Sequence, residues 1–165
     1  MSIFLHQNDL PDSVSLGKSI AIDTETKGLN LNRDRLCLIQ LSDGNGDAHL
    51  VQIAAENKQK SPNIEALLKD EKVEKLFHFA RFDLAVLMRD ISPVLGPIYC
   101  TKIASKLART YSDRHGLKEL CSELLSIELS KQQQSTDWGS EVLSEAQKNY
   151  AASDVLFLHR LKIKL

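Results

Sequence analysis

The chain has 165 residues, 42% of them hydrophobic and 26% charged, and its formal net charge is -1. These values predict one folded domain over residues 1–165 and argue against a surface coated in positive potential. We find neither a signal-peptide pattern nor a membrane-length apolar run, so we expect a cytoplasmic protein with no membrane partner. The cysteines, Cys37, Cys100 and Cys121, are far apart and lack metal-binding spacing, which predicts buried, reduced thiols.

The first half of the chain predicts an antiparallel meander followed by one helix and one strand. The expected strands are residues 19–24, 36–41 and 48–53, and the turn sequence Asp-Gly-Asn-Gly precedes the third. Ser61 and Pro62 predict an N-cap and a first-turn proline for a helix that reaches residue 68, before a short strand over 75–79.

The second half predicts mostly helices. We expect helices over 81–89, 102–109 and 117–125, and a strand over 98–101. Ser144 and Gln147 form a capping-box signal for a last helix that runs to the chain end. Together the elements predict an α/β fold, with a mixed five-stranded sheet flanked by helices.

Two carboxylates lie at the end of the first predicted strand, at Asp23 and Glu25. Because side chains alternate across a strand, Ala21, Asp23 and Glu25 face one way, whereas Ile20 and Ile22 face the other. Two anions this close repel each other, and oxygen ligands on a strand suit a hard divalent cation such as Mg²⁺ or Mn²⁺.

Further acidic residues occur at two later junctions. Asp83 lies where a short strand passes into a helix, and its alternative role is to interact with the helix dipole. Tyr150 and Asp154 are four residues apart on the last helix and therefore share a face, although Tyr150 taken alone is slightly more typical of a tyrosine at the core edge. The full ordered set is unlikely to arise by chance.

This set resembles the DEDD superfamily of 3′-to-5′ exonucleases, in the subgroup with tyrosine in the last motif and a ribonuclease H-like fold. Within the subgroup the chain is similar to ribonuclease D, and more so to the single-domain nanoRNase C form. The second similarity rests on the segments 32–37, 78–85, 100–107, 111–119 and 130–138.

The resemblance implies two divalent cations, Mg²⁺ or Mn²⁺, held by Asp23, Glu25, Asp83 and Asp154. Asp23 would share both ions, Glu25 and Asp154 would complete one, and Asp83 would hold the other. Tyr150, whose ordinary pKa is about 10, is a poor base at neutral pH, so we expect it to orient the attacking water.

Substrate contacts are expected mainly from motif positions. In the related oligoribonucleases a leucine at this place in Asp-x-Glu-x-x-Gly-Leu wedges between two bases, so the resemblance makes Leu29 the candidate wedge, with core packing as the equal alternative. The other candidates are Thr24, His78, Arg114, His115 and Lys118. His78 is otherwise a packed histidine. Lys102, Lys106 and Arg109 share a helix face that is suited to phosphates or simply solvated.

The resemblance also implies the substrate and partners. The chain has no room for the C-terminal helical domain of ribonuclease D, so we expect dinucleotides or very short RNA, cleaved to nucleoside 5′-monophosphates, and a homo-oligomeric ring. NanoRNase C proteins continue past the last helix, whereas this chain ends within it. The alternatives are an exonuclease acting on longer RNA or on single-stranded or duplex DNA, and an inactive nucleic-acid-binding module.

Overall fold

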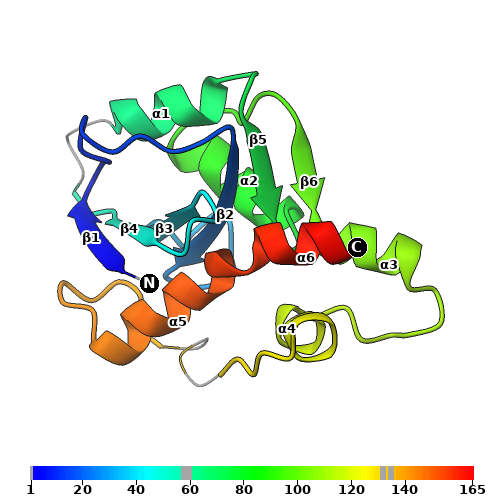
Figure 1. The fold of residues 1–165 in the computed structure, drawn as a ribbon. Coiled ribbons are helices and arrows are strands. Elements are labelled where there is room, and N and C mark those ends of the chain that lie inside the picture. Colours follow the sequence, from blue (N-terminus) through cyan, green and yellow to red (C-terminus); the bar gives the residue numbers. More distant parts are fainter. Residues whose placement is uncertain (1, 57–60, 131–132, 134–135) are drawn as a thin grey trace.

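The computed structural model describes residues 2–56, 61–130, 133 and 136–165. Its six-stranded sheet has the order β1-β4-β3-β2-β5-β6, with helices on both faces (Figure 1). The strands are β1 (Ile3–Gln7), β2 (Ser19–Thr26), β3 (Leu36–Ser42), β4 (Ala48–Gln52), β5 (Glu74–Phe77) and β6 (Ile98–Cys100). The helices are α1 (Pro62–Lys69), α2 (Arg81–Asp90), α3 (Thr101–Ala108), α4 (Leu117–Leu125), α5 (Glu145–Leu156) and α6 (Leu158–Lys164).

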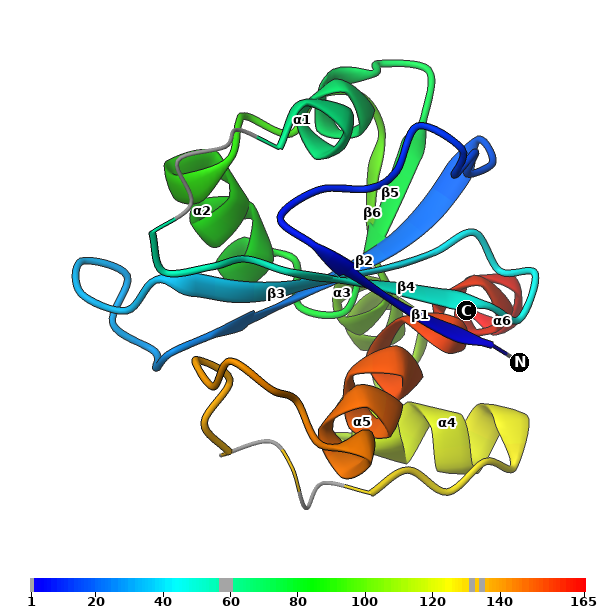
Figure 2. The ribbon, with the colours of Figure 1, turned by 90° about the vertical axis from the view of Figure 1, so that its left-hand side faces the viewer.

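The sheet lies between two helical layers. Figure 2 shows α1 and α2 on one side, and α4, α5 and α6 on the other. Alternation along β2 matches this division, because Ile20 and Ile22 join the core under α1 and α2, whereas Ala21 joins the core under α5 and α6. This arrangement confirms the predicted mixed α/β fold.

The predicted meander is confirmed by antiparallel pairing of β2 with β3 and of β3 with β4. Gly44 and Gly46, in the turn between β3 and β4, have φ angles of 84° and 101°, a region that favours glycine. The sheet has one strand more than predicted, because β1 pairs in parallel with β4. The burial of side chains along β1 does not alternate as in a strand with one buried face. Only the pairing with β4, which is distant in sequence, identifies residues 3–7 as a strand.

The start of α1 is capped differently from the prediction. The Ser61 hydroxyl donates to the Asn8 carbonyl at 2.6 Å and does not cap the helix. Instead, the carboxylate of Asp9 accepts hydrogen bonds from the backbone N–H groups of Asn63 and Ile64, both at 2.9 Å. A side chain distant in sequence thus satisfies the helix terminus.

The last helix begins as predicted but is divided. Ser144 and Gln147 form both halves of the capping box at the start of α5. The helix does not run unbroken to the chain end, because it breaks at Phe157, whose backbone ends α5 and begins α6. The break lets α5 pack over β2, β3 and β4, while α6 packs against α4 and β5.

The remaining predictions concern the cysteines and the membrane. All three cysteines are free thiols; Cys37 and Cys121 are buried and Cys100 is half-buried. Among the helices of the described residues, none combines the length and the apolar character needed to cross a bilayer.

Candidate active site

Three carboxylates converge between β2 and α5. Asp23 and Glu25 extend from β2 on the face of Ala21, and Asp154 approaches from α5. Each offers one carboxylate oxygen, and these oxygens all lie within 4.8 Å of one another. The alternation along β2 and the helical spacing on α5 therefore bring these three carboxylates together, as the sequence predicts.

Asp83 reaches this cluster from the other helical layer. It lies in the first turn of α2 and is only 4% exposed. The Thr24 hydroxyl donates to its Oδ1 at 2.7 Å. Because Thr24 alternates with Asp23 along β2, it faces the α2 layer, and its hydroxyl holds Asp83 in place. The structure thus gives Thr24 a role as a support for an acidic residue.

The electrostatics of the four acids show that they cannot all be ionised without compensation. Burial, followed by the charges of Asp83, Asp154 and Glu25, raises the pKa of Asp23 well above its usual value. The pKa of Glu25 rises to about 9, mainly through burial and then through Asp154. Burial raises the pKa of both Asp83 and Asp154 to about 7. A divalent cation among these hard oxygen donors would relieve the repulsion.

Tyr150 lies one turn before Asp154 on α5, and its hydroxyl hydrogen-bonds to the Asp154 carboxylate. Burial and the nearby carboxylates raise the pKa of Tyr150 further above its ordinary value. The ring packs against that of Trp138, with centroids 6.0 Å apart. Tyr150 is therefore a neutral hydroxyl at physiological pH and can act only as a hydrogen-bonding group.

Gln40 is a site residue that the sequence analysis missed. It pairs with Asp23 across β2 and β3, and its Nε2 lies 3.4 Å from Asp23 Oδ2. Its Oε1 is buried without a hydrogen-bond partner among the described residues. Nothing in the sequence separates Gln40 from other polar residues on buried strands, because only the pairing of β2 with β3 brings it to Asp23.

Leu29 lies in the loop that follows β2, and it is 84% exposed. This exposure excludes core packing, which was the alternative to the wedge. The loop is braced by Asp34, whose Oδ2 accepts the Asn30 N–H at 2.9 Å and whose carbonyl accepts Arg89 Nη2 at 2.9 Å. Gly28 packs so closely that an added Cβ would lie 2.3 Å from Asp34 Oδ2.

The basic segment between α3 and α4 is largely engaged with the protein itself. Arg109, which the sequence places on a phosphate-facing or solvated surface, is 6% exposed and pairs with Glu123. Arg114 also pairs with Glu123, with Nε 3.0 Å from Oε1. His115 is buried, and its Nδ1 lies 2.8 Å from Ser105 Oγ. These contacts account for Arg109 and His115 as structural groups, whereas the Arg114 side chain is 65% exposed. The role of Arg114 and His115 with substrate stays a prediction.

Lys118 and His78 differ in their surroundings. Lys118 is half-buried at the start of α4. His78 directly follows β5, and its Nδ1 lies 2.9 Å from the hydroxyl of Thr101. Lys102, on the adjacent helix α3, lies over the ring of Phe79 at 4.1 Å.

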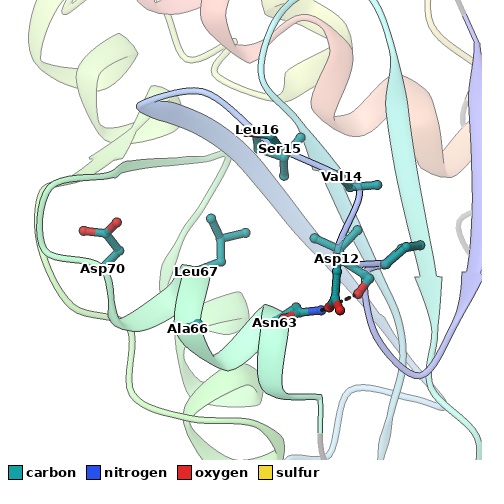
Figure 3. Close-up of a pocket in the computed structure, with 10 residues that line it drawn as sticks. Asp12, Val14, Ser15, Leu16, Asn63, Ala66, Leu67 and Asp70 are labelled. Carbon is teal, nitrogen blue, oxygen red and sulfur yellow. Dashed lines mark hydrogen bonds between the residues drawn. The ribbon is translucent and has the colours of Figure 1, made fainter.

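Two hollows of similar size lie on opposite sides of the sheet. One of about 330 Å³ is lined by Tyr150 together with residues of α5 and of the segment before it. The other, of about 310 Å³, lies between α1 and the segment 10–16 (Figure 3). There Asn63 donates to Asp12 at 2.8 Å, and the predicted site residues are absent from its lining.

The sequence matches the 3′-5′ exonuclease family over residues 6–165. The chain belongs to this family. The chain superposes on Brucella melitensis NrnC with a TM-score of 0.92 at 59% identity, covering 99% of this chain and 79% of that one. Escherichia coli ribonuclease D gives a TM-score of 0.74 at 30% identity, covering 89% and 39%.

Curated relatives agree with these structures. Ribonuclease D of Acidiphilium cryptum is 30% identical to this chain over 149 residues, which is 90% of this chain and 37% of that protein. The chain therefore spans little more than a third of that relative's length. Further structures show Brucella melitensis NrnC bound to pGG and with bound Mg²⁺. These comparisons confirm the predicted relationship to ribonuclease D and nanoRNase C.

Proposed function

We propose that the chain is a metal-dependent 3′–5′ exoribonuclease that hydrolyses dinucleotides or very short oligoribonucleotides to nucleoside 5′-monophosphates. The observation that carries this proposal is the convergence of Asp23, Glu25 and Asp154, with oxygens within 4.8 Å of one another, beside the buried Asp83. Such a cluster repels a phosphodiester unless cations intervene, and divalent cations serve this purpose in phosphoryl-transfer enzymes.

The donor set fits Mg²⁺ or Mn²⁺, because both ions prefer carboxylate oxygens as ligands. Burial and mutual repulsion raise the pKa of the Asp23 and Glu25 carboxyls, and a bound cation would offset this repulsion. In our proposal Asp23 serves two ions, Glu25 and Asp154 complete one, and Asp83 completes the other. When bound, the ions would acidify the attacking water and offset the negative charge of the scissile phosphate.

The protein's own groups position the reactants. The neutral Tyr150 hydroxyl, hydrogen-bonded to Asp154, would orient the attacking water. The Thr24 hydroxyl holds Asp83 through the 2.7 Å bond, and Gln40 supports Asp23 from β3. Catalysis on this proposal needs no tyrosinate, in agreement with the raised pKa of Tyr150.

Two observations support a short substrate. Leu29 is 84% exposed on a braced loop next to the carboxylates, as a wedge between two bases requires. The relative with 58% identity binds pGG, a very short RNA. The formal net charge of -1 agrees, because a long polyanion is usually held by a broadly basic surface.

A length series of labelled RNAs, from two residues upward, tests this function with Mg²⁺ or Mn²⁺ and with chelator. We expect the dinucleotide to be cleaved fastest, chelator to stop all cleavage, and Asp23→Ala to abolish turnover. Equal cleavage of long RNA or single-stranded DNA would instead show the broader exonuclease. RNA binding without release of mononucleotide would show an inactive binding module.

We further propose that the chain forms a homo-oligomer through α3. Ile103 and Leu107 lie four residues apart on this helix and are 50% and 76% exposed. Exposed apolar side chains grouped in this way favour a protein contact. Leu107→Lys should reduce the mass measured by light scattering, whereas an unchanged mass would exclude this surface as the contact.

A further inference from the structure

Phe79 is an exposed aromatic residue held in an unusual backbone conformation. Its φ angle is 72°, in the left-handed region that is costly for a bulky residue. Among the described residues, the other non-glycine residues with positive φ are Asn8 and Ser126, which have small polar side chains. Phe77 and Ala80 are buried in the core under α1 and α2, whereas Phe79 is 48% exposed. Because glycine or asparagine would adopt this φ at lower cost, the backbone turn alone does not explain an aromatic residue here.

Phe79 lies at the edge of the sheet that carries the carboxylates. β2, β5 and β6 are parallel to one another, so their C-terminal ends lie at one edge. The acidic pair is in the C-terminal half of β2, and the loop with Leu29 follows this strand. Phe79 is in the junction between β5 and α2, four residues before Asp83. The hydrogen bond from Thr24 to Asp83 joins the start of α2 to β2.

A cation lies over the ring of Phe79. Lys102 Nζ is 4.1 Å from the ring centroid, which is a cation–π contact, and this lysine is in the first turn of α3. The preceding Thr101 fixes that turn to the junction, because its hydroxyl oxygen lies 2.9 Å from His78 Nδ1 and 3.1 Å from the Phe77 carbonyl oxygen. In the part of the chain that the structure describes, no carboxylate forms an ion pair with Lys102. The ring is thus held by a positive charge that no acidic side chain of the described fold pairs with.

An exposed aromatic ring at a nuclease site is suited to stack on a nucleobase, because every base has a π-face. A wedge at Leu29 would contact the inner faces of the two bases of a dinucleotide, so their outer faces need other partners. We propose that the Phe79 ring stacks on the outer face of one base of the bound substrate, and that Lys102 is the positioning residue that holds the ring. This inference rests on the proposed exoribonuclease function.

The test compares a diribonucleotide with two analogues, each of which lacks one base, in the wild-type protein and in Phe79→Leu. Leucine keeps an apolar side chain but has no flat aromatic face. We expect kcat/KM for the diribonucleotide to fall about tenfold in Phe79→Leu, as for the loss of one base stack. The analogue that lacks the stacked base should be cleaved equally by both proteins, which identifies the base.

Controls separate this inference from general damage to the site. Phe4→Leu makes the same chemical change at a phenylalanine that is 43% exposed on β1, three strands from β2 in the sheet, and should leave all three rates unchanged. An equal loss on all three substrates in Phe79→Leu would overturn the stacking contact while leaving the exoribonuclease intact. If the wild-type protein cleaved none of them, the proposed function itself would fail.

The role of Lys102 is tested by removing its charge. Lys102→Met should lower kcat/KM for the diribonucleotide about two- to fivefold, and Lys102→Arg, which keeps the cation–π contact, should retain the wild-type rate. In the Phe79→Leu background, Lys102→Met should have no further effect, because the ring that it positions is gone. An equal effect in both backgrounds would show that Lys102 meets the substrate directly, which would overturn its positioning role.

A measurement of stability separates a role in binding from a role in folding. Phe79→Asn places at this position a residue that tolerates positive φ. We expect Tm to stay within about 3 °C of the wild type, because relief of backbone strain offsets the lost contacts, while kcat/KM falls as in Phe79→Leu. A lower Tm with unchanged kcat/KM would show that the ring serves the fold, and would overturn the proposal.

Discussion

At the scale of single residues, supporting hydrogen bonds determine how the acidic groups are presented. Thr24 donates to Asp83 at 2.7 Å, and this bond lowers the pKa of Asp83 against the larger effect of burial. Residues that orient metal ligands in this way commonly change metal affinity when they are replaced. We therefore expect Thr24 and Gln40 to affect catalysis through the acids that they hold.

Thr24→Val keeps the shape of the side chain but removes the donor to Asp83. We expect the Mg²⁺ concentration for half-maximal activity to rise on the order of tenfold, while saturating Mg²⁺ restores most of the rate. A metal titration of initial rates measures this change. A lower rate that no Mg²⁺ concentration restores would contradict the supporting role.

Tyr150→Phe removes the hydroxyl that hydrogen-bonds to Asp154. The attacking water would lose one orienting contact, so we expect kcat to fall on the order of 100-fold with Mg²⁺ binding largely kept. Single-turnover kinetics and a metal-binding titration separate the two effects. Loss of metal affinity in this variant would instead make the hydroxyl part of the metal site.

At the scale of elements, hydrogen bonds brace the loop after β2 that presents an exposed side chain. The Asp34 carboxylate accepts from the Asn30 N–H within the loop, and the Asp34 carbonyl accepts from Arg89 of α2. Gly28 permits the close approach to Asp34. The sequence motif alone left Leu29 divided between wedge and core, and its exposure in the folded loop decides against the core.

Leu29→Ala should leave stability within about 0.5 kcal/mol of the wild-type protein, because the side chain is 84% exposed. Loss of its apolar contact with the bases should lower kcat/KM for a dinucleotide about tenfold. Ile163→Ala, at an equally exposed position on α6, is the matched control and should change neither quantity. An unchanged dinucleotide rate in Leu29→Ala would exclude the wedge.

At the scale of the whole molecule, the site joins all three layers. Asp23 and Glu25 come from the sheet, Asp83 from the layer of α2, and Asp154 from the layer of α5. Each of these carboxyls has a higher pKa in the folded protein than in the unfolded chain, so the folded state retains protons that the unfolded chain releases. The stability of the folded state therefore decreases as the pH rises from the unfolded pKa of each group to its folded pKa.

With chelator present, stability should fall between pH 7 and 9, because folded Glu25 (pKa about 9) keeps a proton that the unfolded chain has already released. The contributions of Asp83 and Asp154 (pKa about 7) are lost below this range. We expect Tm to decrease by about 5 °C over this range. This pH range lies above the ordinary pKa of His6, His49 and His78. The pKa values of these histidines are lowered in the folded protein, so their effect on stability is confined to lower pH and has the opposite sign. Calorimetry at several pH values measures the effect.

Mg²⁺ should restore the lost stability at pH 9, because it compensates the ionised carboxylates. Asp23→Asn, which removes one buried charge, should show a smaller decrease with pH and little response to Mg²⁺. A Tm that rose from pH 7 to 9 in chelator would contradict the repulsion among these acids.

Local sequence periodicity was by itself sufficient to predict much of the fold and of the candidate site. The alternation in β2 placed Asp23 and Glu25 on one face, and the four-residue spacing on α5 placed Tyr150 and Asp154 together. The capping box also gave the start of α5, because each of these features depends only on residues close in sequence.

The tertiary structure decided what depends on distant segments. Pairing with β4 made a strand of residues 3–7, and pairing with β3 brought Gln40 to Asp23. The junction of β5, β6 and α3 placed Thr101 against His78. Such contacts arise from the packing of the layers, which no short stretch of sequence encodes.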